Sequence, residues 1–298
     1  MARWVAAAAV ALQVVRGTFT YDEGVTRREL FLAQASYCVS PLNVSWTCPT
    51  CAKTPEVSIE AVVDAGGGRA LVGYDAHDDT IFASFRGSDD AQNWINNLDF
   101  VKEYPYPGRP DVGVEAGFYK WYLALRPGVV AALATATARH GAKPVKTTGH
   151  SAGAGPAVHL ALELELGIAG PGYTVANVTT FGSPRLGDGA FVAFFENATF
   201  KNTRVTHDRD IVPHLPLDDM FWLGYASFAG VSSSPPRGAR RERRRHVPTE
   251  VFYDAASAHS TVCDGSGEDE ACSDRCDLCT SVEDHLFYLN TSLGTCAC

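Results

Sequence analysis

Hydrophobic and polar residues alternate along the chain in two periods, which predict strands and helices in turn. Residues 57–63 and 69–74 are rich in β-branched and apolar side chains and are joined by three glycines at 66–68, which predicts a β-hairpin. Further strands are expected at 81–85, 143–148, 175–181 and 203–206, and helices at 118–140, 152–166 and 191–195. Because strands alternate with helices, the pattern indicates βαβ units and a largely parallel sheet, with the hairpin adding antiparallel edges. The predicted fold class is α/β.

The domain organisation follows from length and hydropathy. The chain has 298 residues, of which 46% are hydrophobic, enough to bury a sizeable core. No internal repeat is visible, and no apolar run reaches the roughly 18–20 residues that span a bilayer. The helix at 118–140 contains Pro127-Gly128, which should kink it or restart it. We expect a single domain over residues 18–298 and no transmembrane segment.

The first residues resemble a secretory signal. Residues 1–3 supply a basic start, and residues 4–15 are apolar except for Gln13, with small residues nearby. We therefore expect residues 1–17 to be a signal peptide and the protein to be secreted. The alternative is a first buried helix, because the cleavage site is poorly marked.

Nine cysteines lie only towards the two ends of the chain. They are Cys38, Cys48, Cys51, Cys263, Cys272, Cys276, Cys279, Cys296 and Cys298. Cysteines placed in this way suit disulfides that tie down the ends, which indicates an oxidising compartment. Glycosylation sequons at Asn43, Asn177, Asn197 and Asn290 agree weakly with secretion, although Asn177 is expected in a buried strand and so unused.

The charge pattern argues against one class of partner and singles out one segment. With 25 basic and 34 acidic residues the net charge is -9, which disfavours a general nucleic-acid binder. Residues 231–245 read VSSSPPRGARRERRR and carry six Arg and one Glu. We rank three explanations for this basic insertion. A solvated disordered loop comes first, non-native sequence such as a translated intron second, and an arm for an anionic surface such as phospholipid headgroups third.

The strongest chemical signal is the sequence GHSAG at residues 149–153, which follows a predicted strand and opens a predicted helix. The pentapeptide alone is weak evidence, but a tight strand-to-helix turn exposes the hydroxyl of Ser151 and requires small neighbours. The helix that follows also directs its N-terminal amides towards a developing oxyanion. The alternative is a glycine-rich loop with an ordinary helix-capping serine.

A nucleophilic serine needs a base, and the base needs an acid that orients it. Asp208 and Asp210 both follow a predicted strand, and Asp210 precedes the apolar anchor Ile-Val-Pro, which favours its burial. His285 lies in an apolar turn, and the order Ser151, Asp210, His285 is that of an α/β-hydrolase. His150, His207 and His214 are weaker candidates for the base.

Several segments together resemble the class 3 lipases of the filamentous-fungal type. They are FRGSDDAQNWINNLDF, TTGHSAGAG, TFGSPRLGD, RVTHDRDIVPHLP, EVFYD and SVEDHLFYL, in that order. The resemblance runs from about residue 29 to 296 and implies an α/β-hydrolase fold with helices on both faces of the sheet. It also implies that Ser151 is the nucleophile, Asp210 the acid and His285 the base, with Ser88 and the Ala152 amide as oxyanion donors.

The resemblance also implies that residues 89–98 form a short helical lid. Four apolar side chains fall at helical spacing on one face, namely Ala91, Trp94, Ile95 and Leu98. Closed, this helix would cover the site, and at a lipid surface it would turn the same face outward. The alternative is an ordinary surface helix that packs on the core.

The family resemblance implies disulfides that join Cys38 to Cys296, Cys48 to Cys51, and Cys263 to Cys272. Cys276 could pair with Cys279, which leaves Cys298 free, although the spacing of the last six cysteines leaves other pairings open. A zinc site built from Cys272, Cys276, Cys279 and His285 is a weak alternative, because it would consume the base. We expect no metal.

The chain departs from the family pattern in three places. The family has Leu where this chain has Ala152, Gly where it has Ala154, and His where it has Glu115. These changes could alter the shape of the acyl pocket or the packing of the helix after Phe118. The basic insertion at 231–245 enters between acid and base and could disturb one wall of the cleft.

These features predict a secreted serine carboxylester hydrolase, first of all a triacylglycerol lipase, acting through an acyl-enzyme on Ser151. It would need no cofactor, act as a monomer, and take lipid or ester substrates at an oil–water or membrane interface. A phospholipase A1 or a feruloyl esterase would use the same triad. A rival of another class is a catalytically inactive hydrolase fold that binds lipid or a protein partner.

Overall fold

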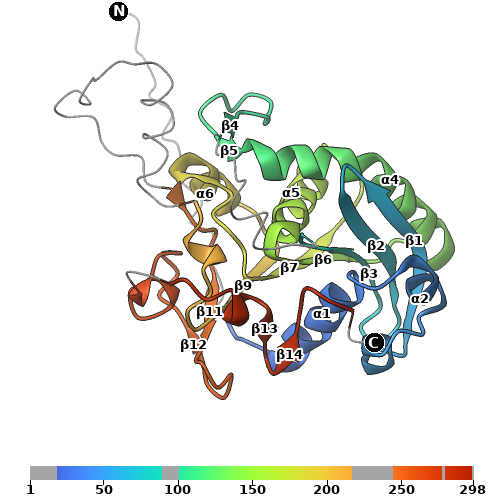
Figure 1. The fold of residues 1–298 in the computed structure, drawn as a ribbon. Coiled ribbons are helices and arrows are strands. Elements are labelled where there is room, and N and C mark those ends of the chain that lie inside the picture. Colours follow the sequence, from blue (N-terminus) through green and yellow to red (C-terminus); the bar gives the residue numbers. More distant parts are fainter. Residues whose placement is uncertain (1–18, 89–100, 217–243, 277–278, 297–298) are drawn as a thin grey trace, which may run out of the picture.

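The computed structural model describes residues 19–88, 101–216, 244–276 and 279–296 (Figure 1). The predicted signal peptide, the predicted lid and most of the basic insertion lie outside the described residues, as does Cys298. Within the described part an eight-stranded sheet forms the centre, in the order β1-β2-β3-β6-β7-β9-β11-β12. The α/β fold class is therefore confirmed.

The strands run parallel in the middle of this sheet and antiparallel at both edges. Their bounds are β1 Val57–Ala65, β2 Gly68–Asp75, β3 Thr80–Phe85, β6 Val145–His150, β7 Val175–Phe181, β9 Lys201–His207, β11 Glu250–Tyr253 and β12 Ser260–Val262. The pairs from β3 to β11 are parallel, whereas β1, β2 and β3 pair antiparallel, and so do β11 and β12. The predicted early hairpin is thus β1–β2, and the second antiparallel edge at β12 was not predicted.

Helices cover both faces of the sheet (Figure 1). Helix α4, Ala116–His140, and helix α5, Ala154–Glu165, pack against each other on one face. Helix α1, Glu23–Ala35, contacts β3, β6 and β7 and lies on the other face. Every residue of α5 from Ala154 to Leu164 is buried, because both the sheet and α4 cover it. No helix of the described residues is both long and apolar enough to cross a membrane.

Helix α4 differs from the expectation that Pro127-Gly128 would kink or restart it. The structure has one helix of 25 residues with Pro127 in its interior. Proline has no amide to donate to the carbonyl of Leu123, four residues earlier, and Leu123 lies on the exposed side of the helix. Gly128 lies against β1, where a Cβ atom would come within 2.6 Å of the Val63 side chain.

Shorter elements complete the described part. They are α2 Ser40–Ser45, α6 Gly189–Phe195, α8 Val282–His285, the hairpin of β13 Phe287–Tyr288 with β14 Thr291–Ser292, and a small antiparallel sheet in the order β10-β8-β5-β4. In this small sheet, β10 is Arg244–Arg245, the last two residues of the basic insertion, and it pairs with β8, Gly187–Asp188. Strands β4, Lys102–Glu103, and β5, Val114–Glu115, complete it.

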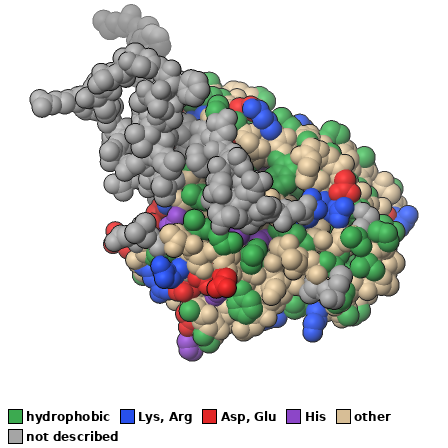
Figure 2. Space-filling view, in the orientation of Figure 1, with side chains coloured by type: hydrophobic (Ala, Val, Ile, Leu, Met, Phe, Trp, Pro, Cys, Tyr) green, Lys and Arg blue, Asp and Glu red, His purple; other side chains and the backbone are tan. Residues whose placement is uncertain are grey.

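Four disulfides join the cysteines in the pairs that the sequence suggested. They are Cys38–Cys296, Cys48–Cys51, Cys263–Cys272 and Cys276–Cys279. The first of them links the residue that follows α1 by three positions to the C-terminal segment. On the face that Figure 2 shows, acidic and basic side chains are scattered among neutral ones.

Candidate active site

Ser151 stands in a strained turn between β6 and the short 3-10 helix at Ser151–Gly153, with φ of 57°. A left-handed backbone is costly for a residue with a Cβ atom, so the surroundings must hold it in place. Only glycine fits two positions before and two positions after Ser151. A Cβ on Gly149 would lie 2.3 Å from the Gly153 carbonyl oxygen, and one on Gly153 would lie 2.4 Å from the Phe85 carbonyl oxygen. The spacing of GHSAG therefore follows from close backbone contacts.

Asp210 lies in the loop after β9, where several groups stabilise its charge. Its Oδ1 accepts a hydrogen bond from the Val212 amide at 2.8 Å, and its Oδ2 accepts one from His285 Nδ1 at 2.9 Å. The Tyr288 hydroxyl also donates to Oδ2. Burial by itself would raise the pKa of Asp210, but the electrostatic interaction with His285 and these hydrogen bonds lower it overall.

His285 ends α8, and the backbone brings it to the acid. Ser281, which caps α8, bridges to Asp210, and its amide donates to the Arg209 carbonyl at 3.0 Å. With Nδ1 held by Asp210, the ring is left with a free Nε2. This Nε2 and the Ser151 Oγ are both buried, and neither has a hydrogen-bond partner among the described residues. A buried hydroxyl and a buried ring nitrogen without partners can exchange a proton with each other when a substrate binds between them and reacts.

Two residues beside the Asp210–His285 pair were missed by the sequence analysis. Gly182 follows β7 with φ of +58°, and a Cβ there would lie 2.8 Å from both Asp210 Oδ2 and His285 Nδ1. Tyr288 is fully buried and donates to the same carboxylate oxygen as His285. The turn GSP at 182–184 marked the end of a strand, but its sequence gave no sign of what lies opposite.

The region expected to bind the oxyanion lies directly against the nucleophile. Ser88 follows β3 by three residues, and Ala152 is fully buried at the start of the 3-10 helix. A Cβ on Gly87 would lie 2.9 Å from the Ser151 Cβ, so residues 86–88, which follow β3, pass close to the serine. We call residues 86–88 the oxyanion segment. The assignment of Ser88 and Ala152 as oxyanion donors stays a prediction.

The rejected candidates lie elsewhere or have other contacts. Asp208 pairs with Arg275 at 2.6 Å rather than with a histidine. His207 Nδ1 interacts with the Asp284 carbonyl at 3.1 Å. His150 is fully buried beneath the site, and burial first, then the charge of His285, lower its pKa to about 3. His150 is therefore neutral and does not replace His285 as base.

The weak zinc alternative is not assembled. Cys272, Cys276 and Cys279 are all bonded in disulfides, and His285 is paired with Asp210. Among the described residues, ligand atoms of Glu250, Cys263 and Cys272 come within 4.8 Å of one another. The two sulfurs of that group form a disulfide, and the carboxylate accepts from the Arg204, Thr206 and Ser273 groups around it.

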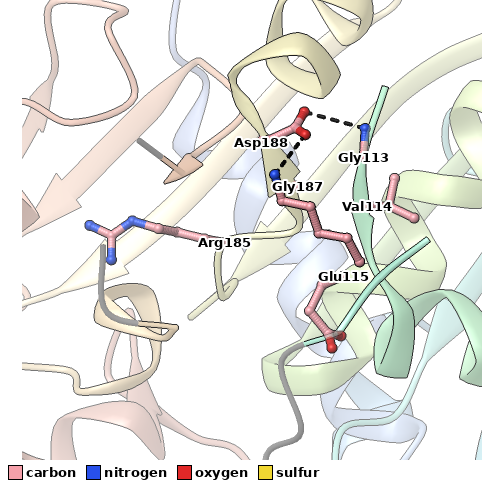
Figure 3. Close-up of a pocket in the computed structure, with 7 residues that line it drawn as sticks. Gly113, Val114, Glu115, Arg185, Gly187 and Asp188 are labelled. Atoms are coloured by element: carbon pink, nitrogen blue, oxygen red, sulfur yellow. Dashed lines mark hydrogen bonds and ion pairs between the residues drawn. The ribbon is translucent and has the colours of Figure 1, made fainter. Parts of the chain in front are cut away.

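A pocket beside the small sheet is lined by charged groups that already have partners (Figure 3). Lys102 Nζ pairs with Asp188 at 3.0 Å, and Glu115 caps α4 by accepting from the amides of Gly117 and Phe118 at 3.0 and 2.8 Å. Arg185 points away from the rest, towards Glu268. Glu115, a departure from the family pattern, thus serves as a helix cap.

The chain is similar to known lipases. The family model for lipase (class 3) matches residues 82–220. A lipase from Rhizomucor miehei is 28% identical over 271 residues, covering 89% of this chain and 68% of the relative. A secreted mono- and diacylglycerol lipase A from Penicillium cyclopium is 32% identical over 188 residues, covering 60% of this chain and 58% of the relative. The chain thus spans less than two thirds of the Penicillium protein.

A solved triacylglycerol lipase whose catalytic centre is described as a serine protease triad has a TM-score of 0.76 to this structure. It is 27% identical, and the match covers 95% of this chain and 99% of that one. The chain belongs to the class 3 lipase family. The fold of this class 3 lipase is the α/β-hydrolase fold, and the family is one of serine ester hydrolases.

Proposed function

We propose that this class 3 lipase is a secreted enzyme that hydrolyses carboxylic esters of acylglycerols through an acyl-enzyme on Ser151. The observation that carries the proposal is the Asp210–His285 pair at 2.9 Å beside the strained Ser151 turn, with Ser151 Oγ and His285 Nε2 both buried and unpaired among the described residues. The relatives described as triacylglycerol and mono- and diacylglycerol lipases support the choice of substrate.

The reaction follows from the proton arrangement of the triad. His285 Nε2 takes the proton of Ser151 as Oγ attacks the ester carbonyl carbon, and the negative charge moves to the carbonyl oxygen. The amide and hydroxyl of Ser88 and the amide of Ala152 bind that oxygen. His285 then gives the proton to the leaving alcohol, and water, activated by the same nitrogen, releases the fatty acid from Ser151.

Asp210 acts through orientation and charge. Its hydrogen bond fixes the proton of His285 on Nδ1, so that Nε2 faces Ser151 as an acceptor. Because the pKa of Asp210 is lowered, the carboxylate stays ionised and stabilises the imidazolium that forms during attack. His150, stacked on His285 with ring centroids 4.6 Å apart, remains neutral and adds no opposing charge.

The remaining expectations complete the proposal. A signal peptide at 1–17 and the disulfides fit export to an oxidising compartment, and the Penicillium relative is described as secreted. The residues of 89–98, with Ala91, Trp94, Ile95 and Leu98 on one face, would act as the lid at a lipid interface. The chain would work as a monomer, with residues 18–298 as one domain.

Active-site labelling tests this function directly. A fluorophosphonate should attach to Ser151, located by peptide mass spectrometry, and Ser151→Ala should lose both the adduct and ester turnover while keeping the unfolding temperature. Turnover retained in Ser151→Ala would refute the assignment. No adduct on folded wild-type protein, with and without detergent, would favour the inactive lipid- or partner-binding alternative.

A second comparison separates the substrates within the class. Rates on triolein emulsions should exceed those on phosphatidylcholine liposomes. Faster release of fatty acid from the liposomes would instead make the protein a phospholipase A1. Activity restricted to feruloyl esters would indicate the feruloyl esterase alternative.

A further inference from the structure

We propose that Tyr37 and His150 are positioning residues that hold the oxyanion segment, residues 86–88, and the general base His285 in a fixed relation. This inference rests on the proposed function of Ser151 and His285. Tyr37 lies just after α1 and is almost completely buried, and His150 immediately precedes the nucleophile. Neither residue belongs to the triad.

A continuous line of hydrogen bonds connects the two parts of the site. The Gly87 amide donates to the Tyr37 hydroxyl oxygen at 3.0 Å, and that hydroxyl lies 2.7 Å from His150 Nδ1. His150 Nε2 lies 2.8 Å from the backbone carbonyl oxygen of His285. Since a carbonyl only accepts, Nε2 carries the proton, so Nδ1 accepts from the Tyr37 hydroxyl. Each bond has a donor and an acceptor in this arrangement.

This line of hydrogen bonds reaches the oxyanion segment at Gly87, close to the nucleophile. A Cβ on Gly87 would lie 2.5 Å from the Tyr37 hydroxyl, 2.7 Å from the His150 carbonyl oxygen and 2.9 Å from the Ser151 Cβ. The residue after Gly87 is Ser88, the proposed oxyanion donor. Loss of the Tyr37 hydroxyl therefore frees the amide that precedes this donor.

The other end of the line supports the base. His150 donates to the His285 backbone, and its ring stacks on the His285 ring at an interplanar angle of 27°. A neutral ring can do this without repelling the imidazolium that His285 becomes. A misplacement of about 1 Å at either end can lower the rate about 100-fold, because the reacting atoms must be aligned.

The chain contains a matched pair that provides a control. The Tyr106 hydroxyl lies 3.0 Å from His159 Nδ1, and both residues are buried. Burial also lowers the pKa of His159 to about 3. This second tyrosine–histidine pair lies in the core between α4, α5 and α6. Its hydrogen bond has the same chemistry but joins neither the oxyanion segment nor the base.

The test compares Tyr37→Phe with Tyr106→Phe on a soluble nitrophenyl ester. In Tyr37→Phe, kcat and the rate of fluorophosphonate labelling should fall about 10- to 100-fold, while KM stays within about twofold. Tyr106→Phe should leave both constants near wild type, although its unfolding temperature falls comparably. Equal kinetic losses in the two variants, or an unchanged kcat in Tyr37→Phe, would overturn the proposal.

Two substitutions of His150 provide an independent measurement. His150→Gln retains an amide that can donate to the His285 carbonyl, whereas His150→Phe retains only the stack. We expect kcat in the order wild type, His150→Gln, His150→Phe, and equal kcat in the two variants would contradict the role. If wild-type protein takes no label at Ser151, the proposed function fails, which is a different result from labelled variants with unchanged rates.

We also infer that Asn197 and Asn290, and not the other two sequon asparagines, carry N-linked glycans when the chain passes through a eukaryotic secretory pathway. This inference rests on the proposed secretion. Asn290 is exposed at the tip of the β13–β14 hairpin with φ of 58°, and Asn197 is exposed just after α6. Asn197 Nδ2 donates to the Ala193 carbonyl at 2.8 Å, but it does so at an exposed position, and a glycosylated amide keeps one N–H for that bond. Both residues lie at the surface, where an attached sugar would point into solvent.

The other two asparagines hold the fold together through the nitrogen that would be modified. Asn43 is fully buried and its Nδ2 donates to the Cys38 carbonyl at 2.9 Å. Asn177 Nδ2 donates to Glu29 Oε1 at 2.5 Å within the interface of α1 and the sheet. A glycan at Asn43 would have no space in the core, and one at Asn177 would remove one of the two protons that its Nδ2 donates, to Glu29 and, at 3.3 Å, to Thr179.

Transfer forms a bond between Asn Nδ2 and C1 of the first sugar. It breaks the bond from C1 to the pyrophosphate of a lipid-linked oligosaccharide donor, and the amide proton is lost to base. Secreted protein from a eukaryotic host should show glycopeptides at Asn197 and Asn290 only, and Asn197→Gln with Asn290→Gln should abolish the shift on endoglycosidase treatment. A glycan at Asn43 or Asn177 in enzyme that labels at Ser151, or unmodified Asn197 and Asn290, would refute the inference.

Discussion

At the scale of single residues, the site depends on a glycine that has no side chain as much as on the side chains that react. Gly182 leaves room for the Asp210–His285 pair, since a methyl group there would lie 2.8 Å from an atom of each. We predict that Gly182→Ala lowers kcat by at least about 100-fold, because it separates acid from base. Kinetics on a soluble ester, with circular dichroism to verify the fold, measure this effect.

The control for this prediction is Gly172→Ala. Gly172 has φ of +85°, but a methyl group added there would meet nothing within 4 Å, so the variant carries the backbone strain alone. It should lower stability slightly and leave kcat unchanged. A similar loss of kcat in both variants would show that strain, and not contact with the acid–base pair, causes the effect.

Tyr288 gives a prediction for the pH dependence. Its hydroxyl donates to Asp210 and helps to lower the pKa of that carboxyl. In Tyr288→Phe the pKa of Asp210 should therefore rise. NMR titration of the Asp210 carboxyl carbon in wild type and variant measures this rise, and an unchanged pKa would show that the hydroxyl does not stabilise the charged carboxylate.

The sequence identified the residues that we propose to react but not those that support them. Ser151, Asp210 and His285 stand out because their types and order match a known chemical arrangement. The sequence does not single out Tyr37, Gly182 and Tyr288, because their importance comes from contacts in space. Those contacts cannot be inferred from the residues next to them along the chain. Their roles depend on contacts between segments that are far apart along the chain.

At the scale of elements, parallel strands bring the site together. Strands β6, β7 and β9 are neighbours in the sheet, so Ser151, Gly182 and Asp210, which follow their carboxyl ends, meet at one edge. The alternation of apolar segments was enough to predict these three strands. Strands β11 and β12 and the small sheet were not predicted, because they are short and their pairing is set by distant partners.

The attachment of α1 to the sheet should depend on pH. Asp75, at the end of β2, binds Arg28 of α1 at 2.5 Å and Lys146 of β6 at 2.8 Å. Burial opposes ionisation of Asp75, but these two partners outweigh it and lower its pKa to about 2. Unfolded, an Asp has a pKa of about 4, so the stabilising contribution is complete above about pH 4 and is lost as the pH falls towards 2.

Asp75→Asn should therefore unfold at lower urea concentration at neutral pH, and its stability should fall less steeply than that of wild type as the pH drops from about 5 to 2. Asp79→Asn is the matched control, because Asp79 pairs with Lys143 at the exposed surface, where ion pairs contribute little. Parallel curves for wild type and Asp75→Asn would rule out this origin of acid sensitivity.

At the scale of the whole molecule, one disulfide joins the beginning of the fold to its end. Cys38 and Cys296 are separated by 258 positions, so their bond removes a large loop from the unfolded chain. Replacing both by Ala should lower the free energy of unfolding by about 2–5 kcal/mol. The Cys48–Cys51 pair spans only 3 positions, and its removal should cost less in the same denaturation experiment.

The position of the base has a consequence for how the enzyme is made. Ser151 and Asp210 follow strands of the main sheet, whereas His285 and Tyr288 belong to a late segment that must dock across the ends of those strands. A nascent chain on the ribosome thus carries its nucleophile and acid well before its base has been translated. On the proposed secretory route, esters in the membrane are then protected from the growing chain, because it cannot react until the late segment has emerged and docked.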